Sequence, residues 1–136
     1  MFLDLHPLVI HFPIALFSSA VLFDFIAVIF KKDELLITSW WVMLLALFSS
    51  AFSIITGLID DSLIGHLFAT FPLWENHGLM QIISILIFCS IFIWRTKQPV
   101  LFNSKKRALI YILIGLTNVV ILFYGSHLGA ILSGRI

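Results

Sequence analysis

Charged residues are scarce in this sequence. Lys, Arg, Asp and Glu make up only 11% of the 136 residues, whereas 61% are hydrophobic and the mean hydropathy is +1.13. So few charges cannot cover the surface of a soluble 15.5 kDa globule, which excludes that class of protein. The net charge of +1 argues against nucleic-acid binding, which needs a dense basic patch. The single cysteine excludes an internal disulfide and a thiolate cluster.

Long apolar runs make up most of the chain. They cover residues 8–30, 37–59, 77–94 and 108–132, and about 20 residues at 1.5 Å rise cross a hydrocarbon core of roughly 30 Å. The sequence therefore predicts an all-α polytopic membrane protein, a single domain (1–136) made of an antiparallel bundle of four transmembrane helices. Residues 60–76 form the longest connection, which we expect to contain a short interfacial helix. Because residues 1–5 lack the cationic head of a signal peptide, we expect the first span to be retained.

Cationic residues gather in the first and third connections, which predicts the orientation. They are Lys31, Lys32, Arg95, Lys97, Lys105, Lys106 and Arg107. Only Arg135 lies on the other side, so the positive-inside rule puts both connections in the cytoplasm and both chain ends outside. Aromatic residues at the expected membrane boundaries agree with this N-out/C-out topology. They are Trp40, Trp41, Trp94 and Tyr111 on the inner side, and Trp74 and Tyr124 on the outer side.

Polar and small residues recur at helical spacing within each span. Such residues usually face away from lipid, so we expect them to line the interior of the bundle. The first three sets are His11, Ala15, Ser18 and Leu22; Ser49, Ser53, Thr56 and Asp60; and His77, Gln81 and Ser84. The fourth consists of Tyr124 and His127 beside the small residues Gly125, Gly129 and Ser133.

All five histidines fall on the predicted outer side. Counting along the helices puts His11, His77 and His127 at a similar depth, with His6 and His66 further out. Two neutral imidazoles on facing helices can hold the iron of a b-type haem, and small residues leave room for the macrocycle. The first and third spans are diagonal in such a bundle, so His11 and His77 are the first candidate ligand pair. His6 and His127 form a second pair, which allows one or two haems.

Other interpretations of these residues stay open. The histidines can instead serve only as hydrogen-bonding groups in a cofactor-free accessory subunit. A divalent-metal site is a third possibility, because Asp60, Asp61 and Glu75 lie on the same side and His66 could contribute. Asp24, inside the first span, can hydrogen-bond within the bundle, reach towards the inner surface, or transfer protons.

The opening motif resembles a known family of membrane proteins. The segment His6-Pro7-Leu8-Val9-Ile10-His11-Phe12-Pro13-Ile14 is similar to the H-P-x-x-V-H-F-P-I opening of the "domain of unknown function 2231" family. Gly57 to Asp60 and His77 match the family's pattern, and residues 125–134 resemble a G-H-x-G-G-x-L-x-H-G tail in which Ser126 and Ser133 replace the histidines. The resemblance implies a four-helix membrane domain associated with redox modules and suspected of binding haem.

The sequence as a whole favours electron transfer over substrate chemistry, because it offers no catalytic nucleophile or acid/base pair. We expect a b-type cytochrome-like subunit in a bacterial inner membrane, with its histidines on the periplasmic side. The expected partners are membrane lipid and other membrane or periplasmic redox subunits, such as c-type cytochromes.

Overall fold

Four long helices form the structure. The computed structural model describes the backbone of residues 5–64 and 77–132, and within these ranges every side chain except those of residues 5–8, 10, 58–64, 77, 129, 130 and 132. The helices are α1 (Leu5–Phe30), α2 (Asp33–Ile64), α3 (His77–Lys97) and α4 (Lys105–Leu132), with a short 3-10 helix, η3 (Leu101–Asn103), before α4. All four are long and apolar enough to cross a membrane, which confirms the predicted all-α polytopic architecture.

Each helix is longer than its predicted span, and two of the extensions change the interpretation of particular residues. Helix α2 continues to Ile64, so residues 60–64 are helical although the sequence predicted a loop there. Helix α3 continues past Trp94 to Lys97 and thereby includes Arg95, which the sequence analysis placed in a cytoplasmic connection. The remainder of the outer loop, with His66, Trp74 and Glu75, lies outside the described residues.

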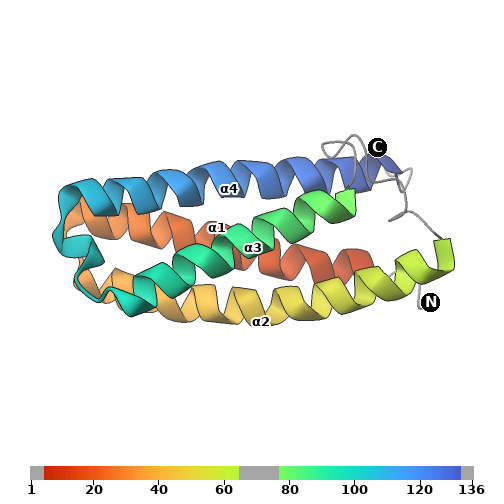
Figure 1. Cartoon of the computed structure of the whole chain (residues 1–136), viewed down its shortest axis with the longest axis horizontal. Helices are drawn as coiled ribbons and strands as arrows, with labels where there is room; N and C mark the ends of the chain where they lie inside the picture. Colours follow the sequence, from red (N-terminus) through yellow and green to blue (C-terminus); the bar gives the residue numbers. More distant parts are fainter. Residues whose placement is uncertain (1–4, 65–76, 133–136) are drawn as a thin grey trace.

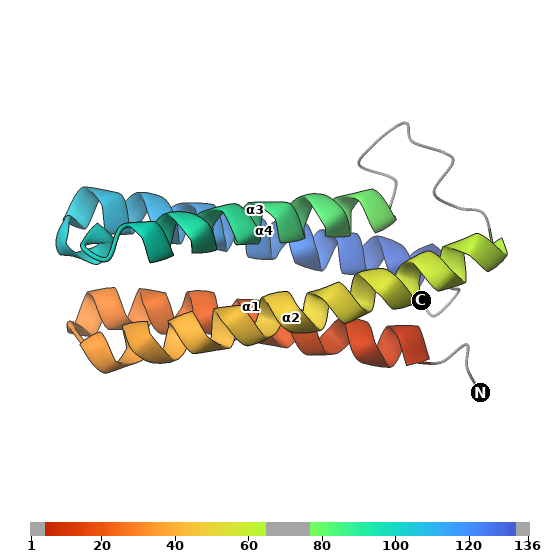
Figure 2. The same cartoon turned by 60° about the horizontal axis from the view of Figure 1, so that its bottom comes forward.

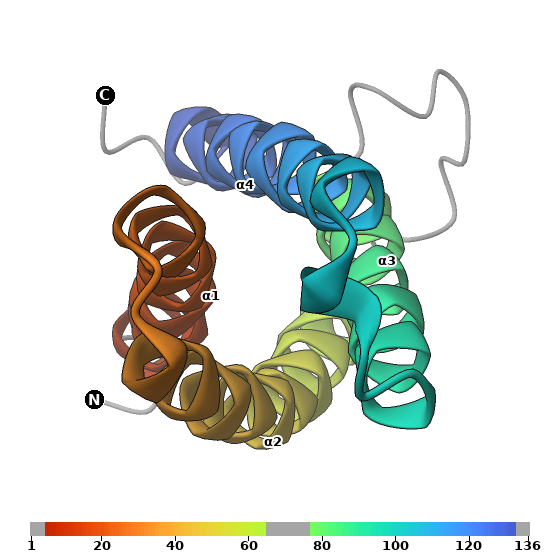
Figure 3. The same cartoon turned by 90° about the vertical axis from the view of Figure 1, so that its left-hand side faces the viewer.

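The helices form an antiparallel ring. Viewed along its long axis, the bundle shows the order α1, α2, α3, α4, so α1 neighbours α2 and α4 and lies diagonal to α3 (Figure 3). The connections α1–α2 and α3–α4 lie at the same end (Figure 1). Figure 2 shows that the bundle consists of two hairpins, α1–α2 and α3–α4, packed side by side. The end with the two short connections is the predicted inner end, and the opposite end is the predicted outer end.

A tight turn joins α1 to α2. Lys31 adopts a left-handed backbone conformation (φ 53°), and the N–H of Lys32 donates to the carbonyl of Ala27 at 3.0 Å. This six-residue closure is the Schellman pattern that ends many helices, usually with glycine at the left-handed position. It sends the chain straight back into α2, which begins at Asp33.

Pro13 lies inside α1 and creates a local need for a hydrogen-bond donor. Proline has no N–H, so the carbonyl of Val9, four residues earlier, loses its helical partner. The hydroxyl of Ser53 on α2 lies 3.3 Å from that carbonyl oxygen and is placed to donate to it. Since an unpaired carbonyl is costly in hydrocarbon, this contact explains why α2 carries a buried serine at this level.

The structure corrects the predicted inward face of α1. Its core face contains Ile14, Phe17, Val21 and Asp24, whereas the predicted stripe of His11, Ala15 and Leu22 is exposed. Because lipid is as apolar as a protein core, the apolar pattern of a membrane helix does not mark its buried side. The hydroxyl of Ser18 on that stripe donates to its own helix, at the carbonyl of Ile14 (2.8 Å).

The predicted inner faces of α3 and α4 are confirmed at Gln81, Ser84 and Gly125, whereas Tyr124 and His127, predicted on the same face of α4, are exposed. Ser133 and the side chains of residues 77 and 129 lie outside the described part of the chain. Gln81 and Ser84 are buried, and Gly125 lies so close to α3 that an added Cβ would be 3.1 Å from Gln81 Nε2. On α2, Ser53 is buried as predicted, but the core stripe continues through Ser50 and Met43 and not through Ser49.

Candidate functional site

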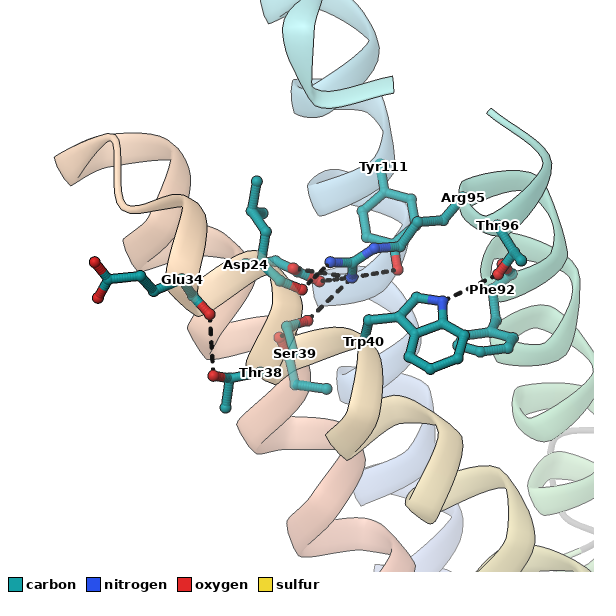
Figure 4. Close-up of polar contacts among 11 residues, drawn as sticks. Asp24, Glu34, Thr38, Ser39, Trp40, Phe92, Arg95, Thr96 and Tyr111 are labelled. Carbon is teal, nitrogen blue, oxygen red and sulfur yellow. Dashed lines mark hydrogen bonds and ion pairs between the residues drawn. The ribbon is translucent and has the colours of Figure 1, made fainter. Parts of the chain in front are cut away.

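A buried ion pair crosses the inner half of the bundle. Arg95 on α3 lies with Nη1 at 3.0 Å from each carboxylate oxygen of Asp24 on α1 (Figure 4). Asp24 is fully buried and Arg95 is only 7% exposed. The two helices are diagonal to each other, so the pair connects the two hairpins through the centre of the core.

The other helices complete the surroundings of the Arg95 guanidinium. Nη1 also lies 3.0 Å from the hydroxyl of Ser39 on α2 and 3.5 Å from that of Tyr111 on α4. Nη2 donates to the backbone carbonyl of Leu36. The guanidinium carbon lies 4.8 Å from the centre of the Phe102 ring in η3, within cation–π distance. We call Asp24, Ser39, Arg95 and Tyr111 the buried polar cluster.

The buried polar cluster changes three sequence interpretations. Arg95 is a core residue and does not contribute to the positive-inside signal, although Lys31, Lys32, Lys97 and residues 105–107 still do. Tyr111, expected in the inner aromatic belt, is buried. Asp24 hydrogen-bonds within the bundle, which was one of its predicted roles. The only signal that pointed to Arg95 was the need of a carboxylate inside a span for a cationic partner.

Two contacts define the axial register of α1 against α3. Phe17 and Phe88 stack with ring centroids 4.2 Å apart, in the middle of the core. Both this pair and the Asp24–Arg95 pair join residues that are 71 positions apart. Because α1 and α3 run in the same direction, one register describes both contacts.

Small and polar residues line the core between Phe17–Phe88 and the outer end. Ser84 and Asn118 join α3 to α4, since the Asn118 amide donates to the Ser84 carbonyl at 2.8 Å. Gln81 Nε2 lies 3.2 Å from the Ser126 hydroxyl. Ser53 on α2 and Gly125 on α4 are further small buried residues in this outer part of the core.

Four of the five histidine positions lie near the outer end of the helices. His6 and His11 lie in the first two turns of α1, His77 begins α3, and His127 lies near the end of α4. The side chains of His11 and His127 are exposed on the outside of the bundle. The His11 imidazole therefore does not lie in the single-chain core, where a haem shared with His77 was predicted.

Extended to the outer end, the 71-residue register sets backbone position 77 level with position 6. Positions 6 and 77 are separated by the same 71 residues as the two core contacts, and each lies 18 residues before Asp24 or Arg95. Eighteen residues are five turns of an α-helix, so position 6 occupies the same helix face as Asp24, and position 77 the same face as Arg95. His11 is about 7.5 Å deeper along the axis. The side chains of His6 and His77 lie outside the described residues.

The predicted divalent-metal site receives no support from the part of the chain that the structure describes. No group of three or more His, Cys, Asp or Glu side chains that could hold a metal ion occurs among those residues. The carboxylates predicted for this site, Asp60, Asp61 and Glu75, lie outside the described side chains, as does His66.

The comparisons with known proteins define the family. A family model described as a predicted membrane protein (DUF2231) matches residues 3–136. No curated protein and no solved structure matches the chain. Four membrane-length helices and a match over nearly the whole sequence show that the chain belongs to the DUF2231 family of predicted membrane proteins.

Proposed function

We propose that this protein is a membrane electron-transfer subunit that holds a b-type haem at the outer end of its bundle through His6 and His77. The observation that supports this pair is the shared 71-residue register of Phe17–Phe88, Asp24–Arg95 and His6–His77. The faces of α1 and α3 that meet at Phe17–Phe88 and at Asp24–Arg95 each carry a histidine at a third level, nearer the outer end. Haem iron can be held by two imidazoles from facing helices, and a shared register of the two helix faces supports His6 and His77 as that pair.

Small and polar side chains among the described residues near this level support the proposal. Helices α2 and α4, which fill the other two corners of the ring, carry Ser53, Gly125 and Ser126 near the outer end of the core. Small residues let a planar group lie between helices in a bundle. Further in, the stacked rings of Phe17 and Phe88 close the core below this level.

The chain's own residues have defined tasks in this proposal. His6 and His77 would hold the haem, and the Ser126 hydroxyl and the Gln81 amide offer polar atoms at the outer end of the core. Bound haem would supply reversible one-electron transfer at its iron. The buried polar cluster at the inner end holds the two hairpins, and hence the two histidine positions, in register. His11 and His127 are exposed and form an alternative pair near the outer surface of α1 and α4.

The proposed setting is a bacterial inner membrane with the histidine end facing the periplasm. Its support is the excess of cations at the opposite end, which persists after Arg95 is assigned to the core. A periplasmic or membrane redox subunit, such as a c-type cytochrome, is the proposed electron partner. A second candidate function is that of a cofactor-free accessory subunit, which the exposure of His11 and His127 on the outer surface favours.

Spectroscopy of the purified protein tests the proposed function. We expect a Soret band and sharp α and β bands on reduction, as low-spin bis-histidine haem gives. The changes His6→Ala and His77→Ala should each abolish the low-spin spectrum, whereas His66→Ala and His127→Ala should leave it nearly intact. Loss of the spectrum in His11→Ala or His127→Ala, but not in His6→Ala, would assign the iron to the exposed pair. A haem-free protein from haem-sufficient cells would favour the accessory subunit.

A cross-linking experiment tests the register without haem. Cysteines at positions 6 and 77, in a Cys89→Ser background, should be joined by a short bifunctional maleimide. The matched control is His6→Cys alone, which keeps the native Cys89. Cys89 is 12 residues beyond position 77, or about 18 Å along the axis, and should not react with position 6. If positions 6 and 77 are cross-linked but the protein shows no haem spectrum, the register is correct and the haem proposal is wrong.

A further inference from the structure

The two turns at the inner end differ in charge. The α1–α2 turn carries Lys31 and Lys32 followed at once by Asp33 and Glu34, so its charges balance. Four exposed cations and no carboxylate lie where α3 ends and α4 begins, and the sequence has no Asp or Glu at all after Glu75. These cations are Lys97, Lys105, Lys106 and Arg107, which we call the cationic tip. Within the described residues the one ion pair is that of Arg95 with Asp24, so the tip has no anionic partner there.

Three of these cations stand where the helix dipole disfavours them. Helix α2 begins with Asp33 and Glu34, and α3 ends with Arg95 and Lys97, both arrangements that the dipole favours. Helix α4 instead has no acidic residue in its first turn and starts with Lys105, Lys106 and Arg107. Positive side chains there add to the positive end of the dipole, so an external anion would relieve repulsion that the protein leaves uncompensated.

The backbone of the cationic tip is ordered before any ligand arrives. Three backbone hydrogen bonds hold it. The N–H of Gln98 donates to the carbonyl of Trp94 (3.1 Å), that of Leu101 to the carbonyl of Gln98 (3.0 Å), and that of Asn103 to the carbonyl of Val100 (3.0 Å). Leu101 is fully buried and anchors η3 against the bundle. The cations therefore lie on two helix ends that a hydrogen-bonded connection holds together. This lowers the entropic cost of gathering their side chains around one ligand.

Exposed apolar side chains adjoin the same cations. Val100 is 56% exposed in the connection, and Leu109 and Ile110 are 56% and 41% exposed just beyond Arg107. A free phosphate would contact only the cations, whereas a lipid also places its chains against apolar residues. We propose that the cationic tip binds the phosphate headgroup of an anionic phospholipid, with its acyl chains along the exposed residues of α4.

Lipid titration of the intact, delipidated protein by native mass spectrometry tests this proposal. The probes are phosphatidylglycerol and phosphatidylcholine with identical acyl chains. We expect the wild type to bind phosphatidylglycerol more tightly. The double change Lys105→Gln/Lys106→Gln should weaken that binding at least tenfold, since each cation near an anionic headgroup is worth roughly fivefold in affinity.

Two matched variants decide whether the site is specific. Lys31→Gln/Lys32→Gln removes the same charge from the balanced turn and should change phosphatidylglycerol affinity less than twofold. Lys105→Arg/Lys106→Arg keeps the charge and should keep the affinity. Equal loss in both glutamine variants would mean diffuse attraction and overturn the proposal, as would equal wild-type affinity for the two lipids. Displacement of the lipid by an equimolar amount of inorganic phosphate would assign the tip to free phosphate instead.

Discussion

Removing the Asp24 carboxylate should strongly destabilise the bundle. The change Asp24→Leu leaves the Arg95 guanidinium buried, with Ser39, Tyr111 and a backbone carbonyl as its only polar neighbours. Breaking a buried ion pair by removing one partner typically costs about 3–5 kcal/mol, because the remaining charge is uncompensated. We expect a loss of this size, since both carboxylate oxygens lie 3.0 Å from Nη1 and neither side chain reaches solvent appreciably.

A double-mutant cycle separates the attraction between the two charges from the free-energy cost of burying them. Replacing both partners, as Asp24→Leu/Arg95→Met, removes both buried charges and should recover most of the stability lost in the single variant. The assay is reversible unfolding in mixed micelles with increasing dodecyl sulfate, followed by circular dichroism. The exposed Asp33→Asn serves as the control and should change the free energy of unfolding by less than about 0.5 kcal/mol. A single variant as stable as the wild type, or a double variant less stable than either single one, would refute this account.

Three further changes test the packing by the same unfolding assay. Ser53→Ala should lower the free energy of unfolding by about 1 kcal/mol, because it removes the hydroxyl that donates to the Val9 carbonyl. Ser53→Thr keeps a hydroxyl and should lower it less, so equal losses in the two variants would contradict this explanation. Phe17→Ala should cost about 3 kcal/mol by emptying the stacked pair at the centre, and a loss below about 1 kcal/mol would show that the core collapses around it. Gly115→Leu should cost about 1–3 kcal/mol, since even a Cβ there is 3.1 Å from Val21 Cγ2, and an unchanged midpoint would disprove that close approach.

The fold could be predicted from the sequence because hydropathy reports directly on membrane crossing. Four long apolar runs predicted the number of helices, and the short connections between them predicted the antiparallel arrangement. The buried side of each helix could not be obtained in the same way, because lipid and core attract the same residues. His11 and Leu22 shared a stripe with Ser18 and were expected inside, yet the serine satisfies its hydroxyl within its own helix.

The candidate site was predicted only in part for a related reason. The sequence predicted that the histidines gather at one end, since that depends only on the direction of each helix. Which histidine lies opposite which depends on the axial offset of α1 and α3, and no periodicity within one helix contains that offset. The stack of Phe17 on Phe88 and the ion pair of Asp24 with Arg95 supply it. The role of Arg95 was missed because a cation two residues before the end of a helix resembles a topology signal.

The division of the ion pair between the two hairpins links their docking to the pairing of two charges. Asp24 belongs to the α1–α2 hairpin and Arg95 to the α3–α4 hairpin, so neither charge is neutralised when its hairpin first inserts. Both lie towards the inner end, where a long side chain such as that of Arg95 can reach the headgroups in the meantime. When the hairpins dock, both charges leave water together and pair with each other. If the hairpins dock at a different axial offset, a carboxylate and a guanidinium remain unpaired in the hydrocarbon region. The ion pair thus favours the alignment in which Asp24 faces Arg95, and a misaligned pair of hairpins carries the cost of two unpaired charges.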